Sequence, residues 1–184
     1  NTDIRQRYYD DNANKTDANG FAKLTYALNP KIDLYGDVQL RNVDYSFLGY
    51  NNELENVTQQ VNYTFFNPKA GLLWRLQDGT QAYGSFAVAN REPNRDDLDE
   101  TTPASRPGPE RLYDTELGIE HRAGRWNAGI NAYYMDYTDQ LVLTGELNDV
   151  GAALRTNVPQ SYRAGVELMF GVQIAKPLTW KANA

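Results

Sequence analysis

The stretch from Ser161 to Ile174 alternates strictly between two kinds of side chain. Its even-numbered residues are all apolar or aromatic, whereas its odd-numbered residues include Arg163, Glu167 and two glycines. A period of two places the apolar set on one face of a β-strand and does not fit the longer period of a helix. Ordinary strands average about five or six residues, so this one is unusually long. The chain must therefore contain at least one long strand with an apolar face and a more polar face.

Weaker copies of the same pattern recur along the rest of the chain. Several reach ten residues, and a strand that crosses a bilayer needs roughly 9–11. The sequence therefore predicts an all-β fold, an antiparallel up-and-down meander of about eight long strands, whose length suits a transmembrane β-barrel. The expected strands are 21–28, 32–41, 69–76, 80–90, 111–122, 126–135 and 161–174, with an incomplete strand after residue 177.

The predicted connections alternate between short and long along a single domain, residues 1–184. Tight turns are expected near residues 30, 79, 124 and 177, where Pro or Gly follows a polar or small residue. Long polar loops are expected near 1–19, 42–61, 91–110 and 145–160. Tight turns at one rim and long loops at the other are typical of an outer-membrane barrel.

Aromatic residues near the strand ends favour a membrane location. Trp74, Trp126 and Trp180 lie close to the predicted tight turns, and each shares the apolar face of its strand. Tyr113, Tyr134 and Tyr162 lie near the long loops, again on the more apolar face. Indole and phenol rings prefer the headgroup level of a bilayer, so we expect these six residues to mark the two membrane interfaces.

The composition excludes several classes of function. The chain has no cysteine and one histidine, which excludes thiolate metal sites, cysteine nucleophiles and multi-histidine metal centres. The net charge of −6 argues against a nucleic-acid partner. No serine-centred elbow, phosphate loop or paired-carboxylate pattern is present. We therefore expect no enzymatic activity, no cofactor and no bound metal.

Two alternatives fit the alternation as well. A small complete β-barrel binding module, either soluble and lipocalin-like or a compact outer-membrane barrel, also needs about eight strands. A structural or adhesive surface protein would keep the β architecture. The soluble module does not explain why long loops and tight turns should separate to opposite rims, or why the tryptophans lie close to the tight turns.

Five segments resemble the C-terminal half of the barrel of TonB-dependent outer-membrane receptors. The resemblance lies in the order and spacing of a Pro-Lys-Ala-Gly-Leu strand, a Tyr-Gly-Ser-Phe strand ending in Arg-Glu-Pro, and a Pro-Glu strand ending in Glu-Leu-Gly, followed by two further strands. These segments are 66–72, 82–93, 109–118, 132–141 and 157–168. The chain begins in a polar stretch and stops part-way into a strand, so we expect a barrel fragment.

The resemblance implies the location and partners of the protein. It implies a transporter in the outer membrane of a Gram-negative bacterium, in contact with outer-membrane lipid. It also implies a plug domain and the TonB complex, which have no counterpart in this sequence and would act through another part of the protein. A small-molecule nutrient is the implied ligand, and we expect an iron chelate, either a siderophore or haem.

Candidate ligand-binding residues lie in one loop and on one strand. In the expected loop, Arg91 and Arg95 can hold an anionic chelate, and the acidic pair Asp96 and Asp97 can bind a hard cation. Arg163 and Glu167 are expected to face the lumen. The plainer interpretation is that these charged residues are a solvated loop and a generic polar barrel lining.

Overall fold

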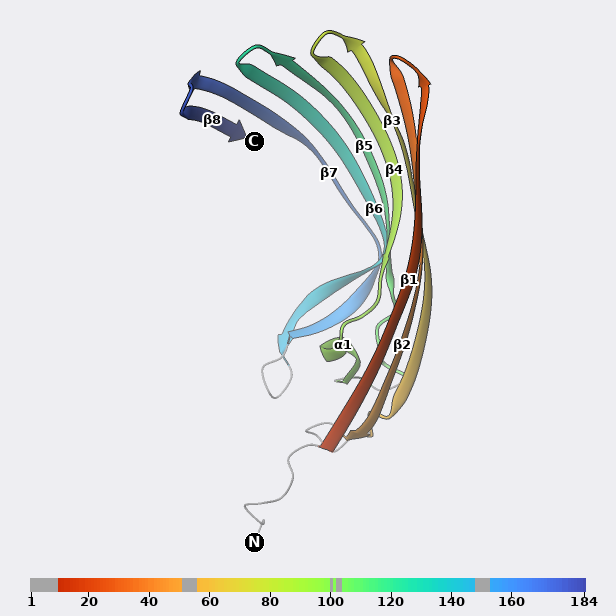
Figure 1. Cartoon of the computed structure of the whole chain (residues 1–184). Helices are drawn as coiled ribbons and strands as arrows, with labels where there is room; N and C mark the ends of the chain where they lie inside the picture. Colours follow the sequence, from red (N-terminus) through yellow and green to blue (C-terminus); the bar gives the residue numbers. More distant parts are fainter. Residues whose placement is uncertain (1–9, 51–55, 100, 102–103, 148–152) are drawn as a thin grey trace.

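The computed structural model describes residues 10–50, 56–99, 101, 104–147 and 153–184. It contains one antiparallel sheet in which each strand pairs with the next in the chain. Figure 1 shows this sheet as a single curved wall with the tight turns along one end. The elements are β1 (Asp10–Asn29), β2 (Ile32–Tyr50), β3 (Gln59–Gln77), β4 (Thr80–Arg91), α1 (Arg95–Asp99), β5 (Glu110–Ala123), β6 (Trp126–Leu147), β7 (Ala153–Ala175) and β8 (Leu178–Asn183).

The predicted all-β meander is confirmed, with 8 strands in sequence order. The order runs from β1 to β8 without a crossover, and no pairing between β1 and β8 occurs in the part of the chain that the structure describes. A compact complete barrel needs that pairing, so the described sheet is an open wall segment. None of the helical residues described forms a span long and apolar enough to cross a membrane.

The strands are longer than the alternation predicts, and three predicted loop ranges are therefore too wide. β1 begins at Asp10, inside the predicted loop 1–19. β2 and β3 leave only residues 51–58 of the predicted loop 42–61, and β6 and β7 likewise extend into 145–160. In the added part of β1 both faces are polar, so the alternation stops while the hydrogen-bond ladder continues. In β2 and β3 the alternation continues but changes phase, and residues such as Tyr45, Phe47 and Val61 are buried on the inner face.

The tight turns occur at the predicted places. β1–β2, β3–β4, β5–β6 and β7–β8 are each joined across two residues. Gly79 and Gly124 have φ values of 74° and 54°, a backbone region that residues with a Cβ enter at a cost. At Gly79 an added Cβ would lie 2.1 Å from the carbonyl oxygen of Arg122, so this turn specifically requires glycine.

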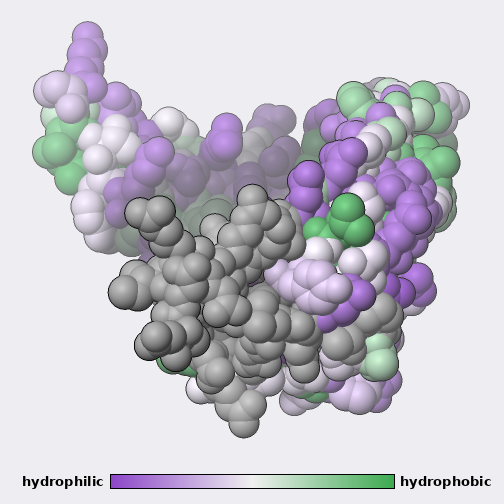
Figure 2. All heavy atoms as spheres, turned by 90° about the horizontal axis from the view of Figure 1, so that it is seen from below, coloured by the Kyte–Doolittle hydropathy of each residue, from purple (hydrophilic) through white to green (hydrophobic). Residues whose placement is uncertain are grey.

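The two faces of the sheet differ in the way that the sequence predicts. The outer, convex face carries exposed apolar side chains in register, such as Leu117, Ala132 and Val166 on β5, β6 and β7. Leu117 and Val166 are 62% and 59% exposed, which is unusual for apolar side chains of a folded protein in water. Hydrophilic residues line much of the hollow on the other side of the wall (Figure 2).

The six predicted interface aromatics lie on the outer face in two groups. Near the tight turns, Phe170 lies between Trp126 and Trp180, with ring centroids 6.5 and 5.9 Å away. Toward the long connections, Tyr134 stacks on Tyr162 at 6.0 Å. Trp74 is also exposed near a tight turn, and Tyr113 stacks on the exposed ring of Phe86. Their role as membrane-interface residues stays a prediction.

Three tyrosines on the inner face cover glycines of the neighbouring strand. Tyr83 of β4 pairs with Gly118 of β5, and a Cβ on Gly118 would lie 2.3 Å from the Cζ atom of Tyr83. The hydroxyl of Tyr83 continues across to donate a hydrogen bond to the Asn131 side chain at 3.1 Å. Tyr35 over Gly71 and Tyr133 over Gly165 repeat the arrangement. The rings fill the space that each glycine leaves on a curved sheet.

This arrangement predicts that Gly118→Val destabilises the wall. The valine side chain would displace the Tyr83 ring and break its bond to Asn131, and such overpacking typically costs about 1–3 kcal/mol. Urea titration of the complete protein in lipid vesicles, followed by tryptophan fluorescence, measures this loss. Gly20→Val is the matched control, because an added Cβ at Gly20 meets no atom within 4 Å. Equal loss in both variants would show that the tyrosine cover is not the cause.

Candidate functional site

The connection between β4 and β5 folds back onto the concave inner face at the long-connection end of the sheet. Figure 1 shows α1 on this side of the wall, in the half of the sheet that lies away from the tight turns. Leu98 of α1 is fully buried, in a cluster with Tyr45 and Phe47 of β2 and Val61 of β3. This apolar contact fixes the connection against the wall.

The short helix is capped by its own side chains. The Asn94 amide nitrogen of the backbone donates to the Asp97 carboxylate at 2.8 Å, and the Asp97 backbone N–H donates to the Asn94 side-chain oxygen at 2.8 Å. This reciprocal pair satisfies two backbone donors that a helix start leaves unpaired. Asp97 also forms an ion pair with Arg155 of β7 at 3.0 Å, and the Asp97 side chain is only 3% exposed.

Side-chain amides hold the two ends of the connection. The Gln59 side chain of β3 donates to the backbone oxygens of Leu98 at 2.6 Å and Thr101 at 3.0 Å. Asn157 of β7 accepts from the Gly108 N–H at 2.7 Å and donates to the Gly108 oxygen at 3.0 Å. The connection is thus bonded to strands on both sides of the hollow.

A network of four charged residues fixes the exit of β4. Glu92 accepts from Arg41 of β2 at 2.7 Å and from Lys15 of β1 at 3.0 Å, and Arg41 also binds Asp17 of β1. The Glu92 side chain is only 9% exposed. Burial raises the pKa of Glu92, but the hydrogen bonds from Arg41 and Lys15 outweigh it and hold the pKa below its ordinary value of 4.5.

The lowered pKa of Glu92 predicts that the start of the connection after β4 becomes less stable in acid. A carboxyl group whose pKa is lower in the folded state stabilises that state fully above its unfolded value, here about pH 4.5, and the contribution is lost as the pH falls through the folded value. We therefore expect hydrogen exchange at the amides that flank Pro93 to accelerate as the pH is lowered from 5 toward 3, after correction for intrinsic exchange. Glu92→Gln should remove this pH dependence, and its persistence in that variant would assign it to another group.

The structure separates the predicted ligand residues into three environments. Arg91 pairs with Glu110 at 3.0 Å, and Asp97 is buried in the loop's own bonding. Arg95 and Asp96 are exposed on α1. Arg163 and Glu167 are exposed on the inner face of β7, four residues apart, which corresponds to about 13 Å along the strand. The Arg163 guanidinium lies over the Tyr137 ring at 5.4 Å.

Sequence reasoning missed the residues that position the loop. Leu98, Gln59 and Asn157 lie outside the alternating segments, and Arg155 lies in a range that the sequence analysis treats as loop. The Arg-Glu-Pro segment at the end of β4 carries part of the family resemblance. Nothing local in the sequence, however, indicates that Glu92 forms ion pairs with residues of β1 and β2. These are long-range contacts between residues that no periodicity connects.

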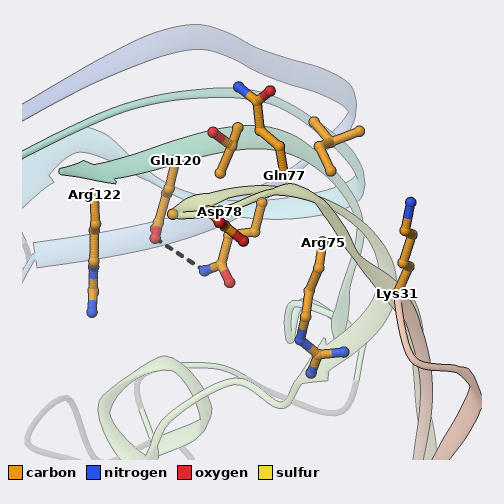
Figure 3. A pocket seen from close by; sticks show the side chains of 10 residues that line it. Lys31, Arg75, Gln77, Asp78, Glu120 and Arg122 are labelled. Atoms are coloured by element: carbon orange, nitrogen blue, oxygen red, sulfur yellow. Dashed lines mark hydrogen bonds between the residues drawn. The ribbon is translucent and has the colours of Figure 1, made fainter.

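A polar hollow of about 690 Å³ lies at the tight-turn end of the inner face. Arg122 and Glu120 lie on one side of it, and Arg75 and Lys31 lie on the other (Figure 3). Arg75 is paired with Asp33, and Glu120 accepts from the Gln81 side chain at 3.3 Å. Within the described ranges, no group of three or more His, Cys, Asp or Glu residues is placed to hold a metal ion.

The chain matches a family model over its whole length. The model is that of the TonB dependent receptor-like β-barrel, matched by residues 1–184. The search of curated proteins found no match. Members of this family are transporters and not enzymes.

Solved structures with the same fold agree with this match. "Copper transporter OprC" is 18% identical with a TM-score of 0.77, and the match covers 93% of this chain and 27% of that one. The ferric yersiniabactin uptake receptor FyuA from Yersinia pestis is 17% identical with a TM-score of 0.71, over 96% of this chain and 27% of the other.

The FrpB iron transporter from Neisseria meningitidis (F3-3 variant) is 18% identical with a TM-score of 0.68, over 93% of this chain and 25% of that one. The chain thus spans about a quarter of the length of these proteins. The predicted resemblance is confirmed: the chain belongs to the TonB-dependent receptor β-barrel family and is a segment of such a barrel wall.

Proposed function

We propose that this chain is part of the wall of a Gram-negative outer-membrane receptor that takes up a scarce nutrient, and that the nutrient is an iron chelate, a siderophore or haem. The observation that carries the proposal is the connection after β4, which is fixed inside the hollow by Leu98 and Asp97. It holds the exposed side chains of Arg95 and Asp96 on the concave side of a wall that also carries the exposed Arg163. A concave chamber with exposed cationic side chains on a fixed scaffold suits capture of a small anionic ligand.

Anionic chelates match the exposed cations of this chamber. Guanidinium groups bind carboxylate and similar oxygen anions through charge-assisted, often bidentate hydrogen bonds. Arg163 is additionally oriented by the ring of Tyr137. The direct binding of a metal cation through Asp96 and Asp97 is not part of the proposal, because Asp97 is occupied by Arg155 and by the backbone of Asn94.

The remaining partners follow from the proposed role. A plug domain would occupy the hollow against the polar inner face, the TonB complex would supply energy through that domain, and lipid would cover the apolar outer face. The names of solved relatives support iron as cargo, since one is a ferric yersiniabactin uptake receptor and another an iron transporter.

Uptake of labelled iron by cells that express the complete receptor tests this function. Ferric catecholate, ferric hydroxamate and haem are offered in turn, and we expect saturable uptake of one of them. Arg95→Gln combined with Arg163→Gln should raise the half-saturating concentration on the order of ten-fold per charged hydrogen bond removed. Arg111→Gln removes an exposed cation of the outer face and should leave uptake unchanged. Absence of uptake for all three chelates would reject the iron assignment.

A further inference from the structure

Three of the four tight turns carry one exposed cation each and no acidic residue. They are Lys31 between β1 and β2, Arg125 between β5 and β6, and Lys176 between β7 and β8. None of these three side chains forms an ion pair with any residue that the structure describes. The fourth turn contains Asp78, which, like Lys31, lines the hollow of Figure 3. The chain as a whole has a net charge of −6, so this row of cations runs against its overall charge.

Two of these cations lie next to a tryptophan of the outer face in the sequence or across a strand pair, and the third lies four residues before one. Arg125 directly precedes Trp126. Lys31 precedes Ile32, which pairs with Trp74, and the Lys31 carbonyl accepts from the Arg75 N–H at 2.7 Å. Lys176 lies in the turn that leads into β8, where Trp180 pairs with Val172. Each of the three turn cations is thus within four residues, or one strand pairing, of an outward indole at the same rim.

The recurrence indicates a common ligand at one depth. Tryptophan rings on a lipid-facing surface settle at the interfacial level of the bilayer, and flanking Lys and Arg side chains extend from there toward the headgroups. At that depth the anionic group that a bilayer offers is the phosphate of its lipids. Each surface cation near an anionic bilayer contributes to attraction, and the contributions of several cations add.

We propose that Lys31, Arg125 and Lys176 bind the phosphate groups of anionic glycerophospholipids in the leaflet that faces the tight turns. Short turns of outer-membrane barrels lie on the periplasmic side, and this places the three cations at the inner leaflet. Neighbouring hairpins are two strands apart, so Arg125 and Lys176 lie roughly 10 Å from each other along the rim, whereas Lys31 is about twice as far from Arg125. The inference rests on the outer-membrane position of the wall and not on the identity of its cargo.

Lipid retention in nanodiscs tests this inference. The complete receptor is assembled in nanodiscs of equal amounts of phosphatidylglycerol and phosphatidylcholine, then released into mild detergent, and the retained lipids are measured by mass spectrometry. We expect enrichment of phosphatidylglycerol over phosphatidylcholine, reduced on the order of five-fold for each cation removed in Lys31→Gln, Arg125→Gln and Lys176→Gln. The triple variant should lose nearly all enrichment, and Arg125→Lys should retain it.

The control is a second triple variant with the same change in net charge. Lys23→Gln, Lys69→Gln and Arg111→Gln remove exposed cations that lie away from the tight turns, and they should leave the enrichment unchanged. Both variants should migrate as folded barrels on a detergent gel that is run without heating, which shows that they fold. Undiminished enrichment in the rim variant, or equal loss in the control, would overturn the proposal.

A parallel assay separates the two sources of lipid phosphate. In nanodiscs that contain lipid A in place of phosphatidylglycerol, an enrichment that depends on the three rim cations, without such a dependence for phosphatidylglycerol, would also overturn the proposal. Iron uptake does not enter any of these measurements, so failure of the proposed cargo would leave their result unaffected.

Discussion

Val166→Arg is expected to destabilise the wall in a bilayer by about 2–4 kcal/mol, the cost of an arginine at the midplane of a lipid-facing β surface. Val166 is 59% exposed on the outer face of β7. It pairs with Ala132 of β6, midway between the stacked tyrosines and the Trp126 group. An arginine there must extend its guanidinium through hydrocarbon to reach water. Urea titration of the complete protein in lipid vesicles measures the loss.

The neighbouring residue supplies a matched control. Glu167 is one position further along β7 and faces the hollow, so Glu167→Arg places the same side chain on the opposite side of the sheet. We expect its effect on unfolding to stay within about 1 kcal/mol, because surface substitutions in a polar environment are usually tolerated. If both variants lose the same stability, the assignment of the outer face to lipid is wrong.

Leu98→Ala is expected to release the connection after β4 from the wall. Leu98 is 0% exposed in a cluster with Tyr45, Phe47 and Val61, and removal of a buried leucine side chain typically costs about 2–5 kcal/mol. The lost stability affects the docking of the connection onto the sheet, because the strands keep the hydrogen bonds between them. Hydrogen exchange of the amides in Arg95–Asp99 should accelerate between about thirty-fold and several thousand-fold. The urea midpoint of the strands should change little.

A volume-conserving substitution distinguishes packing from helix propensity. Leu98→Met keeps an apolar side chain of similar volume and should cost less than about 1.5 kcal/mol, so exchange in α1 should stay close to that of the native protein. Unchanged exchange in Leu98→Ala would show that the polar bonds of Asp97 and Gln59 hold the connection without the apolar contact.

Alternation predicted the strands because the two sides of this wall meet different environments. Along 161–174 one set of side chains points to the outer face and the other to the hollow, and β7 reproduces that division throughout. The turns at Gly79 and Gly124 were equally predictable, since their backbone requires positive φ. The far ends of β1, β6 and β7 carry no regular alternation and were not predictable. At the far end of β2 the alternation changes phase, because Tyr45 and Phe47 face inward and pack on Leu98.

The candidate site was predictable in composition but not in arrangement. The sequence indicated a charged loop between β4 and β5; Arg95 and Asp96 lie there on α1, whereas Arg91 is the last residue of β4. It did not indicate that Asp97 forms an ion pair with Arg155, or that Glu92 binds Arg41, which is 51 residues away in the chain. Such pairings depend on which strands the meander brings together, and no local pattern encodes them.

The most direct test of the central claim is a scan of solvent environment along β7. Single cysteines are introduced at each position from 162 to 172 of the complete barrel, which the cysteine-free sequence of this segment permits, and are labelled with a nitroxide in lipid vesicles. Collision with dissolved oxygen should dominate at even-numbered positions and collision with a water-soluble nickel chelate at odd-numbered positions. The opposite phase, or no alternation, would contradict the assignment of the apolar face to lipid and of the charged face to the interior of a receptor barrel.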